Sequence, residues 1–154
     1  MGVKKSFRDR LHSLFSTDKA DQILKKMEID AIERGLPIVG RCRGQVLVDV
    51  IHRIKPKRIL EVGTFMGYST ILMARELDND AEIITVEFNK ALAGIAKENV
   101  KKAEIRPKVE ILVDDALNSI PKLDGEFDLV FLDGSKRQYL DYLRVVESKL
   151  HEGS

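Results

Sequence analysis

One stretch, Lys57–Ser69 (KRILEVGTFMGYS), constrains the fold of this chain more than any other. Its apolar residues Ile59, Leu60 and Val62 are typical of a strand that is covered on both faces. Gly63 and Gly67 follow, and they allow a tight turn and a close approach of the backbone to another group. Apolar residues then recur at helical spacing over 71–77. The stretch predicts a strand, a glycine turn and a helix start, the arrangement with which α/β proteins hold nucleotide-like ligands.

The spacing and charge of this turn indicate which ligand it suits. Gly63 and Gly67 give G-x-x-x-G rather than the G-x-G-x-x-G of dinucleotide sites, and no lysine precedes a Ser/Thr as in a P-loop. A nicotinamide-dependent dehydrogenase is therefore disfavoured. Glu61, at the end of the strand, suits a cation better than a pyrophosphate. S-adenosylmethionine fits, because Glu61 suits its ammonium group and the helix N-terminus suits its carboxylate.

Length and composition favour a single globular domain. The chain has 154 residues, of which 44% are hydrophobic and 33% charged. We expect no membrane span, because no run approaches the ~20 apolar residues that one needs, and no signal peptide. Cys42 is the only cysteine, which excludes an internal disulfide and favours a reducing, cytoplasmic location. We expect Cys42 to be buried or partly buried and inert.

The net charge of +1 conceals an uneven distribution. Residues 1–58 carry 14 Lys/Arg and 7 Asp/Glu, whereas residues 59–154 carry 12 and 18. One interpretation is a solvated basic face on N-terminal helices. The other is an attraction for an anionic substrate or RNA.

Periodicity predicts an N-terminal helical extension over 1–56, followed by a cofactor-binding α/β core over 57–154. Apolar spacing indicates a short helix near 7–15, and Asp18 can cap a second helix that stops at Gly35. Alternation of strands and helices then implies right-handed crossovers and a parallel sheet. A third early helix is expected at about 43–54, strands at 58–62, 82–86, 108–113 and 127–132, and later helices at about 68–77, 90–102, 116–121 and 138–150.

Each predicted strand ends in an acid. These acids are Glu61, Glu87, Asp114 or Asp115, and Asp133. In a parallel sheet they share the ligand-binding edge, where they would repel one another without a cation or hydroxyl donors. Acids also favour helix N-termini for structural reasons alone, by ~0.3–1 kcal/mol. Four acids in register with a glycine turn favour a ligand, and Glu87 lies at about the offset from which an acid meets ribose hydroxyls.

Several ordered motifs together resemble a known family. They are Glu61–Ser69 (EVGTFMGYS), Val86-Glu87, Asp114–Leu117 (DDAL), Phe127–Lys136 (FDLVFLDGSK) with Tyr139, and Val39-Gly40 followed by Gly44-Gln45. From about Leu36 onward the chain resembles the catechol-O-methyltransferase-like group of class I S-adenosylmethionine-dependent O-methyltransferases. This resemblance implies a Rossmann-like fold with strand order 3-2-1-4.

The resemblance also implies residue roles. Glu61 and Ser69 would hold the amino-acid end of the cofactor, and Glu87 the ribose hydroxyls. The pocket would be completed by Gly63 and Phe65 as a wall, Val39 and Gly40 as a cover, and Asp115 and Ala116 beside the adenine, with Asp114 where the family usually has glycine.

Two further residues would serve the reaction. The resemblance makes Asp133 the first ligand of a divalent cation such as magnesium, as well as a cofactor-site residue, and Lys136 the base near the accepting hydroxyl. Such a cation lowers the pKa of a bound hydroxyl, and a lysine can take its proton. Lys136 is equally well explained as a surface lysine at a helix start.

The chain departs from the family after Ser154. The family continues there into another strand, whose closing Asp-Asn pair completes the metal site. We therefore expect a C-terminally incomplete protein in which Asp133 alone is a poor metal site. The apolar strand at 127–132 would then lie on an open edge and pair with a partner or a second copy.

These features favour an S-adenosylmethionine-dependent O-methyltransferase that acts on a small hydroxylated, catechol-like acceptor. One alternative is a cofactor-binding module without turnover. Another is an RNA-modifying methyltransferase that uses the basic N-terminal helices, which the near-zero net charge makes less favoured, so nucleic acid is not an expected partner.

Overall fold

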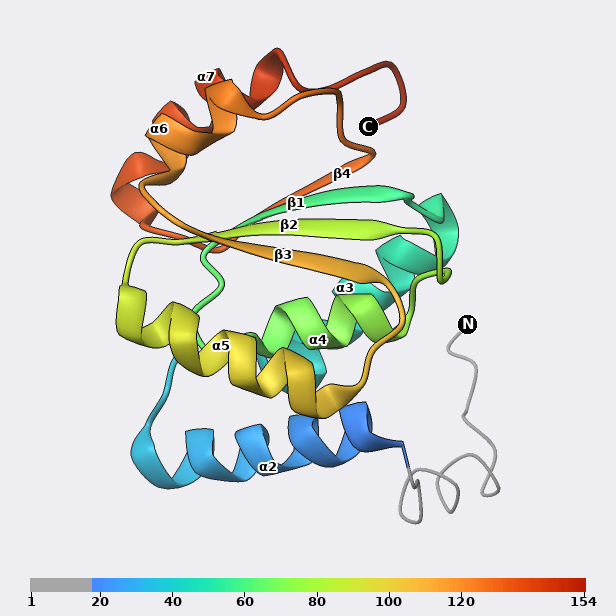
Figure 1. Cartoon of the computed structure of the whole chain (residues 1–154), viewed down its shortest axis with the longest axis vertical. Helices are drawn as coiled ribbons and strands as arrows, with labels where there is room; N and C mark the ends of the chain where they lie inside the picture. The colour runs from blue at the N-terminus through green and yellow to red at the C-terminus, as the bar shows by residue number, and fades with distance from the viewer. Residues whose placement is uncertain (1–17) are drawn as a thin grey trace.

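The computed structural model describes residues 18–154, and its centre is a four-stranded parallel sheet (Figure 1). The strand order is β3-β2-β1-β4, which confirms the predicted fold class and the order 3-2-1-4. The strands are β1 (Arg58–Val62), β2 (Glu82–Glu87), β3 (Lys108–Val113) and β4 (Leu129–Leu132). The helix expected near 7–15 lies outside the described residues.

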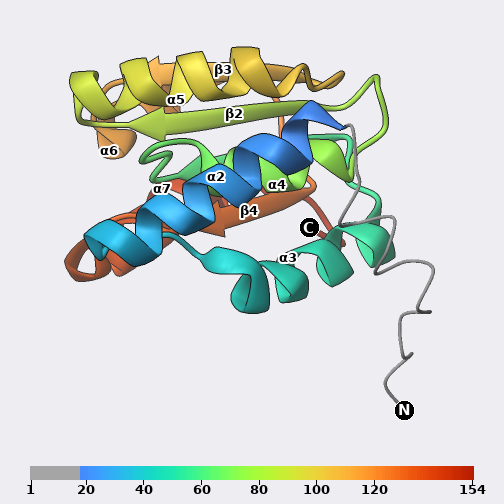
Figure 2. The same ribbon diagram turned by 90° about the horizontal axis from the view of Figure 1, so that it is seen from below.

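Helices cover both faces of the sheet. One face carries α3, α4 and α5, the other carries α6 and α7, and α2 forms a further layer across α4 and α5 (Figures 1 and 2). The helical segments are α2 (Lys19–Arg34), α3 (Gly40–Ile54), α4 (Tyr68–Arg75), α5 (Lys90–Ala103), α6 (Ala116–Ser119), η1 (Ile120–Lys122), η2 (Lys136–Gln138) and α7 (Tyr139–Glu147). No helix within residues 18–154 combines the length and apolar character that crossing a bilayer requires.

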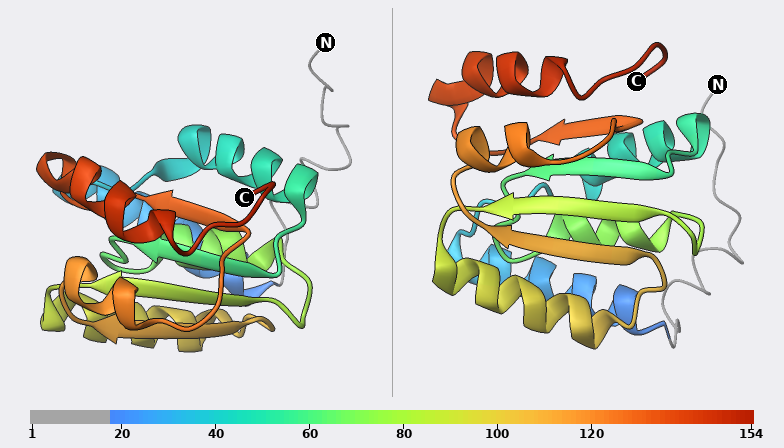
Figure 3. Two further views of the ribbon diagram at one scale, coloured as in Figure 1. Left: turned by 90° about the horizontal axis from the view of Figure 1, so that it is seen from above. Right: turned by 45° about the horizontal axis from the view of Figure 1, so that its top comes forward.

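The sheet register decides which side chains meet which helices. Ile59 pairs with Ile83, and both pack with residues of α3 and α4. Leu60 pairs with Ile84, and both belong to the core under α6 and α7. Because successive residues point to opposite faces, the burial of Ile59, Leu60 and Val62 shows that β1 is covered on both sides. A parallel sheet places all strand ends at one edge, which lies at the arrowheads in Figure 3.

Both ends of α2 follow the sequence signals. Asp18 Oδ1 accepts a hydrogen bond from the Ala20 backbone N–H at 3.1 Å and caps α2, and Gly35 ends that helix with φ of 64°. Asn89 caps α5 in the same way, accepting from the Ala91 and Leu92 N–H groups. α3 begins at Gly40, three residues earlier than expected.

The start of β4 differs from the prediction because its first residues have other partners. Asp128 Oδ2 accepts from the backbone N–H groups of Lys57 at 2.7 Å and Arg58 at 2.8 Å, so its side chain fastens the entry into β1. Phe127 forms an isolated parallel bridge with Leu150. The strand proper therefore begins at Leu129, and α7 ends at Glu147 so that the chain can reach Phe127.

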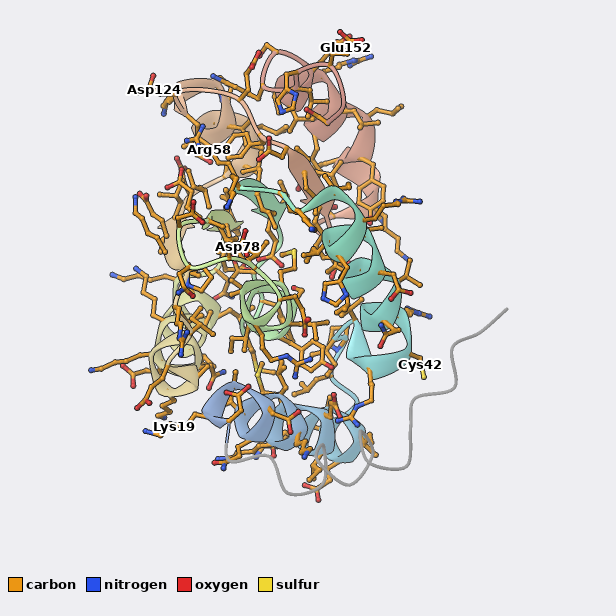
Figure 4. All side chains as sticks on the ribbon, turned by 90° about the vertical axis from the view of Figure 1, so that its right-hand side faces the viewer. Lys19, Cys42, Arg58, Asp78, Asp124 and Glu152 are labelled. Carbon is orange, nitrogen blue, oxygen red and sulfur yellow. The ribbon has the colours of Figure 1, made fainter. Side chains whose placement is uncertain are left out.

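Cys42 was expected to be buried or partly buried, and this prediction is wrong. The residue is exposed on the first turns of α3 and points away from the body of the molecule (Figure 4). α3 turns its other side inward, where Gly44, Leu47, Val48 and Ile51 are buried.

Candidate functional site

The carboxyl ends of β1, β2 and β4 meet at Gly63. Its backbone N–H donates to the Val86 carbonyl at 2.9 Å, and its φ of 98° is accessible mainly to glycine. A Cβ at this position would lie 2.6 Å from the backbone oxygen of Asp133. The turn after β1 is therefore held against the backbone that leaves β4, and only a residue without a side chain fits there.

Glu61 lies just before this turn and is completely buried. Ser69 Oγ donates to its Oε1 at 2.5 Å, and Thr70 Oγ1 donates to its Oε2 at 2.5 Å. The Thr85 hydroxyl adds a further hydrogen bond to the carboxyl. Three hydroxyl groups thus surround one carboxyl group, which supplies the hydroxyl donors that a strand-end acid requires.

Burial changes the proton affinity of this carboxyl group. Loss of solvent raises the pKa of Glu61 to about 7, although the hydrogen bonds from Ser69, Thr70 and Thr85 act to lower it. The negative charge of Asp133 adds to the increase, which shows that these two acids are electrostatic neighbours. Glu61 therefore changes its charge near neutral pH, unlike an ordinary glutamate.

Glu87 lies on the same face of the sheet as Glu61. Glu61 pairs with Thr85, and Glu87 comes two residues after Thr85, so the three side chains point to one side. Both Glu87 oxygens accept backbone hydrogen bonds at 2.8 Å, one from Phe65 and one from Asn89. Glu87 is 9% exposed and shapes the turn after β1, in which Phe65 has φ of 50°.

Asp133 and Lys136 lie beyond the end of β4, and both are exposed. Partial burial raises the pKa of Asp133, while the positive charges of Lys136 and Arg43 act in the opposite direction. The acid thus faces two cations, one from η2 and one from α3. Sequence reasoning gave no role to Arg43.

The described residues do not fit a metal site. Within residues 18–154 no group of three or more His, Cys, Asp or Glu side chains is arranged to hold an ion. A divalent cation such as magnesium needs about six oxygen ligands, and Asp133 supplies one carboxylate. The metal role that the resemblance gave to Asp133 therefore stays a prediction, and no reaction step is assigned to a cation.

The remaining predicted site residues lie at the starts of α6 and α3, and within residues 18–154 they form no hydrogen bond with Glu61. Asp115 Oδ1 accepts from the Leu117 N–H at 2.9 Å and caps α6, and Ala116 is buried beneath it. Val39 and Gly40 form the start of α3, where Gly40 has φ of 67°. Among the described residues, no hydrogen bond joins any of these four to Glu61.

Sequence reasoning missed the threonines around Glu61. Thr70 and Thr85 are completely buried, and Thr85 shares a 2.6 Å hydrogen bond with Thr64 in the glycine turn. The sequence did hold one signal for them. Thr85 is a polar residue within the apolar segment IITVE, and in the parallel register it lies opposite Glu61 of β1. Phe88 was missed as well, although it follows Glu87 directly and is 81% exposed.

A separate hollow of about 380 Å³ lies at the other edge of the sheet, between the ends of α3 and α4. His52 and Glu76 line it, with Nε2 and Oε2 2.8 Å apart, and Asp78 in Figure 4 marks its rim. None of the predicted site residues borders this hollow, so it is distinct from the carboxyl edge.

Comparison with known proteins identifies the family of this chain. The sequence model of the O-methyltransferase family matches residues 15–154, and the chain belongs to this family. It is 34% identical to a catechol O-methyltransferase of Mycobacterium tuberculosis over 75% of the chain and 53% of that relative. It is 38% identical to catechol O-methyltransferase B of Danio rerio, over 71% of the chain and 43% of that relative. The chain thus spans about half the length of these curated relatives.

A solved structure shares the fold of this chain. The O-methyltransferase TomG of Streptomyces achromogenes, which is involved in tomaymycin synthesis and was solved in complex with SAM, superposes with a TM-score of 0.77. The match has 30% sequence identity and covers 97% of this chain and 71% of TomG. The fold is therefore that of the Rossmann-like O-methyltransferases.

Proposed function

We propose that this chain is the cofactor-binding part of an S-adenosylmethionine-dependent O-methyltransferase with a small, catechol-like hydroxyl acceptor. The observation that carries the proposal is the pair of acids, Glu61 and Glu87, on one sheet face at either side of the Gly63 turn. Family membership, the catechol O-methyltransferase relatives and the SAM complex of TomG support the same assignment.

The cofactor would lie across the carboxyl edge of the sheet. Glu61 and Ser69 would meet its amino-acid end, and Glu87 its ribose hydroxyls. Ser69 is 5% exposed whereas Glu61 has no exposed surface, so the ammonium group would reach the carboxyl beside the Ser69 hydroxyl. The pocket would be closed by Gly63 and Phe65 on one side, Val39 and Gly40 on another, and Asp115 and Ala116 beside the adenine.

Methyl transfer depends largely on positioning, because the acceptor oxygen must align with the methyl–sulfur bond. Lys136, in η2 just beyond the end of β4, would take the proton of the acceptor hydroxyl. Asp133, which interacts electrostatically with Lys136, would keep that lysine oriented. A cation supplied with the acceptor would add Lewis acidity, but the described residues do not by themselves hold one.

Binding of S-adenosylhomocysteine tests the cofactor assignment. We expect calorimetry to show binding by the wild type, and Glu87→Gln to weaken it by roughly 10- to 100-fold, since hydrogen bonds to a charged group are lost. Asp78→Asn is the control, because Asp78 is exposed at the opposite edge and bonds Lys57. Absence of binding by the wild type would reject the assignment.

A methyl-transfer assay on the same protein distinguishes an enzyme from a cofactor-binding module. Methyl transfer to a catechol, with or without added magnesium, would establish the activity. Tight cofactor binding without any transfer would instead favour a module that holds the cofactor. Salt-sensitive RNA binding would favour the basic N-terminal helices as a nucleic-acid surface.

We also propose that a second copy of the chain adds to the free edge of β4. Within residues 18–154, β4 pairs along its length with β1 alone, and all four of its apolar residues are only partly buried. Such an edge is a template for further strand pairing. Light scattering after size exclusion is expected to show a dimer that dissociates on dilution, and a monomer at every concentration would contradict this.

A cytoplasmic location is proposed on chemical grounds. Cys42 is the only cysteine of the chain, and its thiol is exposed. An unpaired exposed thiol is favoured in a reducing compartment.

A further inference from the structure

The hydroxyl groups around Glu61 differ in their access to a ligand. Ser69 is 5% exposed, so it can contact a bound molecule as well as the carboxyl group. Thr70 is completely buried, and the acceptor of its hydroxyl is Glu61 Oε2. Any influence of Thr70 on a ligand must therefore pass through Glu61.

The fold explains why this hydroxyl is in place. Ser69 and Thr70 are neighbours in the first turn of α4, and each bonds a different oxygen of the same carboxyl group. Thr85 approaches from β2, where it is the cross-strand partner of Glu61. Thr85 is in turn bonded to Thr64 of the glycine turn, so the group links the turn, the sheet and the helix.

We propose that Thr70 is a positioning residue for the cofactor: its hydroxyl, without touching the ligand, fixes one oxygen of Glu61 and stabilises the ionised carboxylate that the ammonium group requires. This inference rests on the proposed function. It assigns to Thr70 a role that neither the family motif nor the sequence pattern gave it.

The physical argument concerns the charge state of Glu61. A buried carboxylate without hydrogen-bond donors is costly, and burial favours its neutral form. A neutral carboxyl group offers an ammonium group far less attraction. Each hydroxyl that donates to the ionised form shifts the balance toward charge, so removal of one donor weakens cofactor binding chiefly at low pH.

The test measures S-adenosylhomocysteine binding by calorimetry between pH 6 and pH 8.5. Thr70→Val keeps the shape of the side chain and removes the hydroxyl, which should move the ionisation of Glu61 upward by about one pH unit. We expect affinity roughly tenfold below wild type at pH 6 and within about twofold of it at pH 8.5. Thr70→Ser should restore the wild-type pH profile.

A matched control variant distinguishes the proposed positioning role of Thr70 from a purely structural role in packing. Ile71→Val shortens a completely buried side chain next to Thr70 and leaves every hydroxyl in place. It should lower stability without changing the pH profile of binding. In the Glu61→Gln background, Thr70→Val should have no pH-dependent effect, since the group through which it acts cannot ionise. If Thr70→Val does not fold, Thr70→Ala carries the same test.

Three outcomes overturn the inference. A Thr70→Val protein that matches the wild type at every pH excludes a role for this hydroxyl, while wild-type binding still supports the proposed function. A uniform loss of affinity at all pH values shows a packing defect instead. No binding by the wild type at any pH overturns the proposed function and, with it, the role of Thr70.

Discussion

Replacement of Gly63 by alanine is expected to lower the free energy of unfolding by about 3 kcal/mol or more and to abolish cofactor binding. The φ of 98° is strained for any residue with a Cβ, at a cost of ~1–2 kcal/mol. The new methyl group would also lie 2.6 Å from the Asp133 carbonyl oxygen, so the β1 turn and the β4 exit would have to move apart. Chemical denaturation measures the loss.

Gly35→Ala is the matched control for Gly63→Ala. Gly35 also has positive φ, at 64°, but a Cβ there would find nothing within 4 Å. The control should cost only about 1 kcal/mol, which isolates the backbone strain from the collision. Equal losses in the two variants would mean that the β1 turn can yield to the methyl group.

Replacement of Glu61 by glutamine is expected to stabilise the protein at alkaline pH. The folded pKa of Glu61, about 7, lies above its ordinary value of 4.5, so the folded chain holds a proton that the unfolded chain has lost. The associated stability is present below pH 4.5 and is lost as the pH rises to about 7. Relative to the wild type, Glu61→Gln should gain roughly 2–3 kcal/mol between pH 5 and pH 8.

Cofactor affinity of the Glu61→Gln variant should fall, although its stability relative to the wild type rises. Glu61→Gln should bind S-adenosylhomocysteine at least tenfold more weakly at pH 8, because the ammonium group loses its charged partner. Wild-type affinity should rise about tenfold from pH 6 to pH 8.5 as Glu61 ionises, and this rise should be absent in the variant. Unchanged affinity in Glu61→Gln would remove Glu61 from the cofactor site.

Glu82→Gln serves as the control for Glu61→Gln, because its effect on the pH dependence of stability has the opposite sign. The hydrogen bond from Arg58 is the main cause that holds the pKa of Glu82 below its ordinary value, at the far edge of the sheet. Ionised Glu82 therefore stabilises the fold above pH 4.5, and that stability is lost as the pH falls. Glu82→Gln should lose stability relative to the wild type as the pH rises and should leave cofactor binding intact.

The sheet could be predicted because its signals are local. β1 and β3 have the predicted bounds, and the Asp18 and Gly35 signals place α2 correctly. The start of β4 could not be predicted in this way, since it depends on where the Asp128 side chain finds donors. Those donors belong to residues 70 and 71 positions away in sequence.

The acids of the site were predictable, but their surroundings were not. Strand ends in a parallel sheet must share an edge, so the placement of Glu61 and Glu87 together follows from the pattern. Which hydroxyls surround Glu61 depends on the register with Thr85 and on the rotation of α4, and neither is encoded in residue spacing. The predicted burial of Cys42 was wrong for a similar reason, because packing sets which side of α3 faces the core.

The helix that carries Ser69 and Thr70 is buried along almost its whole length. Seven consecutive residues of α4, Tyr68–Ala74, are buried, whereas α5 buries only Ala93, Ala96 and Ala103. The exposed side of α5 can therefore accept substitutions without disturbing the core, whereas every position along that stretch of α4 lies in the core. Substitutions in α4 will disturb the packing that holds Ser69 and Thr70 against Glu61, whereas substitutions on the exposed side of α5 will not.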